Sequence, residues 1–186
     1  MTKYEATYIE PVRQKLREAA EHMREMPAHR VDGGTLDGHR VDMLTWFDED
    51  HWLDRPGDCG TVGCIAGHVV AMHDGYDKAR RMATGVLEFE SSFGIRAAEL
   101  LGLNGGHADD AGIANALFHP LKGWDKPVQR EIERHIDGEH CAHMLEFVAD
   151  NLYREDGGKV TRLTATAVRC EWLNVQHRIA IAEELE

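Results

Sequence analysis

Residues 61–73 read TVGCIAGHVVAMH, and this stretch decides the fold. From position 64 to position 72 it is apolar on almost every side of a helix, which is typical of a helix buried at the centre of a protein. Thr61 is a suitable N-cap, because its hydroxyl can accept a bond from a first-turn amide. Asp74-Gly75 then closes the helix. The stretch therefore predicts a central, buried helix.

Helical spacing of apolar residues recurs on both sides of this stretch. Proline and glycine residues mark where most of these patterns end. Together with residues 61–73 they predict an all-α, mainly helical fold, a compact bundle of six or seven helices in one domain spanning residues 1–186. The other expected helices cover residues 8–25, 92–101, 108–118, 127–136, 139–153 and the segment from Thr164 onward.

Residues 30–60 break the helical pattern. Asp-Gly turn signals occur there, and residues 40–43 alternate in a way that favours one short strand or a hairpin. Residues 36–58 carry seven Asp or Glu against two Arg. We interpret this part as an irregular acidic segment on the outside of the helices. The alternative is a surface that attracts a basic partner or mimics the phosphates of DNA.

Composition narrows the class of protein. The chain has 186 residues, of which 42% are hydrophobic and 29% charged, and this is an ordinary globular balance. Its net charge of −12 argues against nucleic acid as a partner. We find no apolar run near the roughly 18 residues of a membrane span and no secretory signal, and four cysteines are too few for a disulfide scaffold. These features predict a cytoplasmic protein without membrane contact.

The most distinctive motif is DCGTVGCIAGH at residues 58–68. It resembles a segment, CGTxxCIAG, shared by a group of uncharacterised small proteins from phages and actinobacteria. Three further stretches, at residues 43–46, 98–103 and 114–118, match patterns that tend to accompany it, so the resemblance covers about residues 40–118. It implies a phage or bacterial origin, with the bacterial host cytoplasm as the location, and it implies no activity.

Within this motif, Cys59, Cys64 and His68 are candidate zinc ligands. Cys64 and His68 stand at i and i+4 on one helical face, and Cys59 precedes the helix. Thiolate and imidazole are the ligands that zinc prefers. The four-residue gap between the cysteines is wider than the usual two, and Asp58 or a distant histidine would have to supply the fourth ligand.

Two other interpretations of the motif remain open. The favoured one is structural, because a reduced cysteine packs as a small buried hydrophobe. The other is nucleophilic catalysis, because a helix N-terminus stabilises a thiolate. Asp58-Cys59-Gly60 is faintly similar to the start of a family of papain-like amidases, which would make His107 a candidate base; the serine of that family's motif is absent here.

Two further patterns have a functional and a structural interpretation. His135, Glu139, His140 and His143 could bind a metal on one continuous helix, although Asp-Gly at 137–138 favours a solvent-facing polar side instead. Residues 98–118 resemble a helix-turn-helix, but the candidate recognition helix starts with two carboxylates and no Arg or Lys compensates them. We therefore expect no DNA reading there.

The sequence thus predicts a non-catalytic, acidic protein-interaction module, with a phage accessory protein acting on a host partner as its concrete form. The expected partner is a protein, in particular a basic one, and no cofactor beyond the candidate zinc is expected. The alternatives are a zinc- or cysteine-dependent hydrolase that uses Cys59 and Cys64 with a histidine, and a DNA-mimic inhibitor. Oligomeric state is not predicted.

Overall fold

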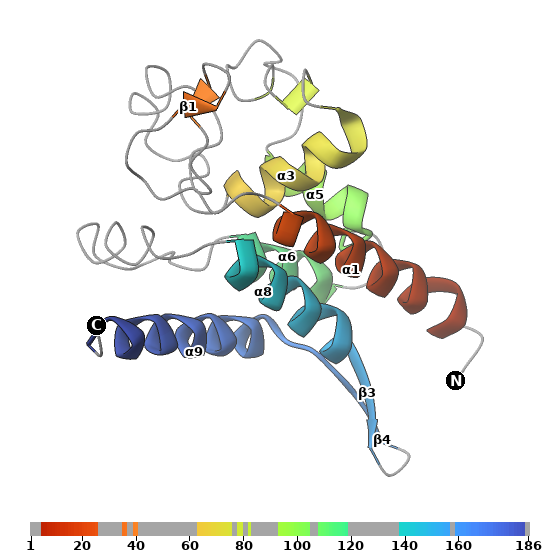
Figure 1. Cartoon of the computed structure of the whole chain (residues 1–186). Helices are drawn as coiled ribbons and strands as arrows, with labels where there is room; N and C mark the ends of the chain where they lie inside the picture. Colours follow the sequence, from red (N-terminus) through yellow and green to blue (C-terminus); the bar gives the residue numbers. More distant parts are fainter. Residues whose placement is uncertain are drawn as a thin grey trace.

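The computed structural model describes residues 5–25, 35–36, 39–40, 63–75, 78–79, 82, 93–104, 108–118, 138–156 and 159–184. These residues form six α-helices, one π-helical turn and two short antiparallel hairpins (Figure 1). The helices and the π-helical turn are η1 (Glu5–Ile9), α1 (Glu10–Glu25), α3 (Gly63–Asp74), α5 (Phe93–Leu101), α6 (Ala108–Phe118), α8 (Gly138–Asn151) and α9 (Ala165–Glu184). The hairpins pair β1 (Thr35–Leu36) with β2 (His39–Arg40), and β3 (Tyr153–Asp156) with β4 (Lys159–Arg162).

The prediction of a mainly helical fold is confirmed. Each of the six described α-helices begins close to its expected first residue, and the five with an expected last residue end close to it. The helix expected at 127–136 and most of the acidic segment at 30–60 lie outside the described residues, and of the strand expected at 40–43 only position 40 is described. The sequence analysis missed the β3–β4 hairpin, because the helix expected to reach position 153 ends at Asn151. Among the described residues, no helix is long and apolar enough to cross a membrane.

Local sequence signals explain three of the helix ends. Gly75 and Gly102 follow α3 and α5 with φ values of +91° and +81°, which glycine adopts most easily. At the second of these ends, the Leu103 amide donates to the Ala98 carbonyl at 2.7 Å and closes the last turn. Thr164 begins α9, because its hydroxyl accepts a bond of 3.2 Å from the Ala167 amide.

The helices pack in pairs around one core. Helix α1 lies along α8, α3 packs against α5, and α6 packs against α9 (Figure 1). Helix α3 carries a continuous run of buried residues, 65–70, as its lack of a polar face predicted. Asp74 at the end of α3 accepts two bonds, of 2.7 and 2.8 Å, from Arg96 of α5, which lowers the pKa of that carboxyl to about 2.

A different set of polar contacts fastens α1 to α8. Arg24 donates to both carboxylate oxygens of Glu146 at 2.7 Å and also to Glu139 at 3.1 Å. Arg13 donates to the carbonyls of Ala149 and Tyr153 at 3.0 and 2.7 Å, where α8 ends. The last carbonyls of a helix have no amide donors within that helix, so the Arg13 guanidinium supplies donors at this end of α8.

One charged group lies inside the core. The Asp110 side chain in α6 is only 2% exposed, and it accepts hydrogen bonds from Tyr8 of η1, at 2.8 Å, and from Arg162 of β4. The Tyr8 hydroxyl also lies 3.2 Å from the Gly102 carbonyl after α5. A buried carboxylate is stable only when such partners replace its lost hydration. This pairing therefore fixes three distant segments around α6.

Replacing Asp110 with Ala should destabilise the fold by about 3 kcal/mol, because Arg162 is then left largely buried without its carboxylate. The neighbouring Asp109 is exposed, so Asp109→Asn is a matched control that should change the free energy of unfolding by less than about 0.5 kcal/mol. Urea unfolding followed by circular dichroism measures both. Equal effects of the two substitutions would contradict the assigned role of Asp110.

Candidate metal centre

The metal ligands predicted from sequence fall in and before α3. Helix α3 contains Cys64 and His68 four residues apart, so the two positions share one face of the helix, as expected. The side chain of Cys64 and the whole of Cys59 lie outside the described residues. Zinc binding by Cys59, Cys64 and His68 therefore stays a prediction, of which the structure describes one side chain.

That side chain, His68, is fully buried. Its ring meets the ring of His22 from α1, with the centroids 5.7 Å apart and the planes inclined at 64°. His22 is half-buried beside Ala19 and Met23, which put this turn of α1 into the core. The contact between α1 and α3 thus brings together two imidazoles from distant parts of the chain.

Burial keeps both imidazoles neutral at pH 7. Loss of hydration, together with the nearby His22, lowers the pKa of His68 to about 3. Desolvation also lowers the pKa of His22, and the charge of Glu25 opposes this only in part. Neutral imidazole is the form that coordinates metals.

The described part of the chain does not complete a metal centre by itself. Among the residues whose side chains are described, no group of three or more His, Cys, Asp or Glu could hold a metal ion. Any centre at this place must draw on Cys64 or on residues outside that part. Since His68 is buried, its ring would hold a metal in the interior, which suits a structural zinc site better than a catalytic one with a position open to substrate.

The sequence analysis missed His22. No sequence pattern links His22 to the motif at 58–68, because His22 lies 46 positions before His68. Only the packing of α1 against α3 places the two rings together. A distant histidine was one expected source of a further ligand, but nothing in the sequence distinguishes His22 from the other histidines.

The second candidate cluster is separated by its neighbours. Glu139 contacts Arg24 of α1, whereas the His143 ring lies 2.7 Å from Glu171 of α9 and 3.2 Å from Arg178. His135 lies outside the described residues. The polar side of α8 faces solvent at Glu139 and His143, as the sequence favoured, and it also carries ion pairs to the flanking helices.

The stretch that resembles a helix-turn-helix is built into the core. Helix α6 packs against α9, and its second carboxylate, Asp110, accepts hydrogen bonds from Tyr8 and Arg162. The described positions of α6 that are at least partly exposed, Asp109, Ala111, Gly112 and Asn115, include no Arg or Lys. That this segment does not read DNA stays a prediction.

Comparison of the chain with protein-family models, with curated proteins and with solved structures gives no match. The fold and the site are therefore described from this chain's own residues.

In the presence of a chelator, acidification should weaken the fold through His68. The unfolded ring binds a proton below about pH 6.5, whereas the folded ring resists it until about pH 3, so stability is complete above pH 6.5 and is lost as the pH falls. Between pH 6.5 and 5 this amounts to about 2 kcal/mol.

The measurement is urea unfolding across this pH range for the wild type, for His68→Leu and for a control, His73→Leu, at an exposed position of the same helix. His68→Leu should have a flatter pH profile than the other two proteins. Parallel profiles for all three would show that His68 does not resist protonation.

Proposed function

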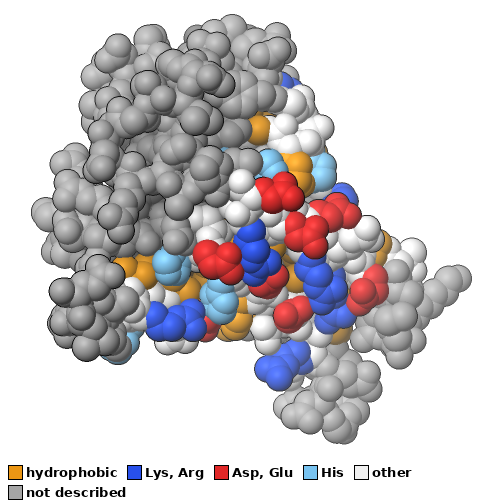
Figure 2. Space-filling view, in the orientation of Figure 1, with side chains coloured by type: hydrophobic (Ala, Val, Ile, Leu, Met, Phe, Trp, Pro, Cys, Tyr) orange, Lys and Arg blue, Asp and Glu red, His pale blue; other side chains and the backbone are white. Residues whose placement is uncertain are grey.

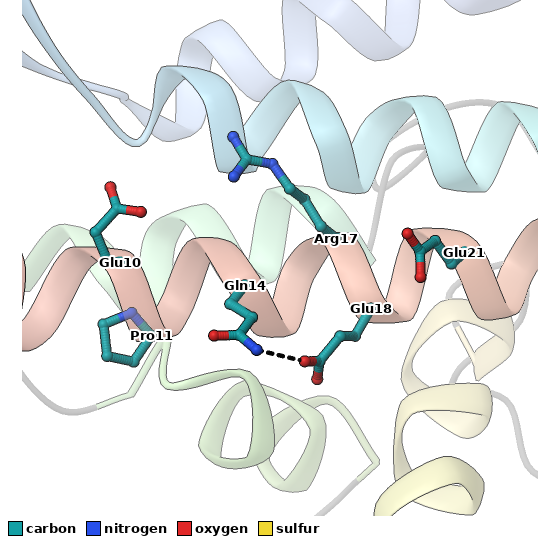
Figure 3. Close-up of a pocket in the computed structure, with 6 residues that line it drawn as sticks. All are labelled: Glu10, Pro11, Gln14, Arg17, Glu18 and Glu21. Carbon is teal, nitrogen blue, oxygen red and sulfur yellow. Dashed lines mark hydrogen bonds between the residues drawn. The ribbon is translucent and has the colours of Figure 1, made fainter.

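We propose that this protein is a non-catalytic, acidic protein-interaction module and that the outer side of α1 belongs to its contact surface. The observation that carries this proposal is a shallow groove of about 510 Å³ along α1 (Figure 3). Four of its side chains are carboxylates or an amide that can accept hydrogen bonds from a basic partner. These side chains are Glu10, Gln14, Glu18 and Glu21.

Three arginines of α1, including Arg17 at the edge of the groove, are paired with partners on α8. Figure 3 shows Arg17 pointing toward α8, where it lies 2.8 Å from Asp150. Arg13 donates to the end of α8 and to Glu10. Among the described residues, no cation forms an ion pair with Glu18 or Glu21, and Glu18 accepts only from Gln14, at 2.9 Å. The groove therefore presents uncompensated carboxylates to solvent.

The charge balance of the rest of the molecule adds to this argument. The residues with described side chains include twelve acidic and ten basic ones, and Figure 2 shows both signs interspersed over the face it displays. The net charge of −12 thus arises mostly in the remaining residues, among them the acidic segment at 36–58. An acidic field over a charge-balanced helical body favours association with a basic partner.

Burial of His68 supports a binding role over hydrolysis. A catalytic zinc keeps a coordination position open to substrate, and a catalytic cysteine needs an accessible base. His68, the histidine of the motif, is fully buried and offers neither. A hydrolase that uses His68 as metal ligand or base therefore has the weaker support, while His107, the other candidate base, lies outside the described residues.

The test compares two variants with equal changes in net charge. Glu18→Gln with Glu21→Gln removes two groove carboxylates, whereas Asp109→Asn with Glu25→Gln removes two exposed carboxylates that do not line the groove. Proteins that the immobilised wild type retains from a bacterial lysate should be basic and should elute with added salt. The groove variant should retain at least about tenfold less of them, whereas the control variant should retain the wild-type amount.

Retention that is equal on the wild type and on both variants would contradict the proposed surface. Identification of a retained protein then allows titration with the purified partner. Competition by duplex DNA for that partner would favour the DNA-mimic form of the proposal, and its absence would favour a phage accessory protein that acts on another kind of host protein.

A further inference from the structure

The contact between α1 and α3 has a chemical feature that packing alone does not require. Two imidazoles, those of His22 and His68, meet in a region whose described side chains include the buried Ala19, Met23 and Val69. Burying polar rings costs free energy unless their nitrogens find partners. The Nε2 atom of His22 is buried and has no hydrogen-bond partner among the described residues.

The spacing of the two rings suits a shared metal ion. Zinc binds an imidazole nitrogen at about 2.0–2.1 Å with tetrahedral angles, so two ligating rings have centroids about 5–6 Å apart and planes inclined to each other. The observed values are 5.7 Å and 64°. Edge-to-face packing of two rings without a metal has the same spacing, so the unpartnered Nε2 atom of His22 is the observation that favours a ligand.

The register of α3 puts a cysteine position one turn before His68. Cys64 precedes His68 by one helical turn, so both positions lie on the face that α3 turns toward His22. Pairs of zinc ligands one turn apart on a helix are common, because their side chains converge on one point.

We propose that His22, Cys64 and His68 bind one Zn²⁺ ion and that His22 is the distant ligand that the sequence motif lacks. The site joins α1 to α3 and is closed to solvent, so the ion has a structural role. Metal binding then adds its free energy to that of folding. This inference is independent of the acidic groove, and its test does not depend on any partner protein.

The first experiment uses the full chain without an affinity tag. Elemental analysis of freshly purified protein should give about one zinc per chain, and a chelator should lower the melting temperature. X-ray absorption at the zinc edge then counts ligands by type. The proposal requires at least two imidazoles and at least one sulfur; zinc absent from the protein, or zinc with a single imidazole, would overturn it.

The second experiment follows Co²⁺ replacing zinc in two variants of His22 and in a control. His22→Asn should lower metal affinity by more than about 100-fold, beyond the roughly 10–100-fold loss caused by removing a merely supporting residue. His22→Cys should retain the ion and add thiolate-to-cobalt absorption, a change that a packing role would not produce. His73→Asn, an exposed change in α3, should leave affinity within about twofold.

If His22→Asn binds cobalt as tightly as His73→Asn, His22 is not a ligand and the proposal fails. If His22→Asn does not fold, as judged by circular dichroism, His22→Cys decides. A folded Cys variant without added charge-transfer absorption would also reject the assignment.

Discussion

The rest of the structure depends on the buried carboxylate of Asp110. Its partners are Tyr8 from the N-terminal turn and Arg162 from the last strand, so it links segments that are 102 and 52 residues away in the chain. The turn with Tyr8 leads directly into α1, and the strand with Arg162 leads into α9. An unpaired charge in the core would be costly, so these helices take positions that satisfy it.

Helix α1 lies between α8 and α3, and its faces make different contacts. One face packs on α8 and is fastened there by Arg13 and Arg24. Another meets α3 through His22. A further face carries the acidic groove, whose carboxylates Glu18 and Glu21 have no cation paired with them among the described residues because Arg13, Arg17 and Arg24 of α1 are engaged with α8. The internal ion pairs thus determine which charges remain for a partner.

The two imidazoles and the carboxylate of Asp110 are all buried polar groups, and burial of such groups is costly unless their polar atoms have partners. Asp110 is satisfied by donors from the protein itself. His22 retains a buried nitrogen without such a donor among the described residues, which is why a bound ion explains it better than packing does. The proposed zinc site would stabilise the packing of α1, the helix whose outer side we propose as a contact surface, against α3.

The sequence by itself determined the helices. Helix positions follow from apolar spacing, and helix ends follow from local residues such as Gly75, Gly102 and Thr164, because backbone hydrogen bonds within a helix span only four residues. Burial of α3 was also readable, since a helix without a polar face has no side to expose.

Only the tertiary structure decided which polar residues work together. Asp109 and Asp110 are neighbours of the same type, yet one is exposed and the other is the buried centre of the fold. Nothing near His22 in the sequence points to His68, and the β3–β4 hairpin was overlooked beside a strong helical pattern. These features depend on how segments far apart in the chain pack against each other, and the spacing of residues along the chain does not predict that packing.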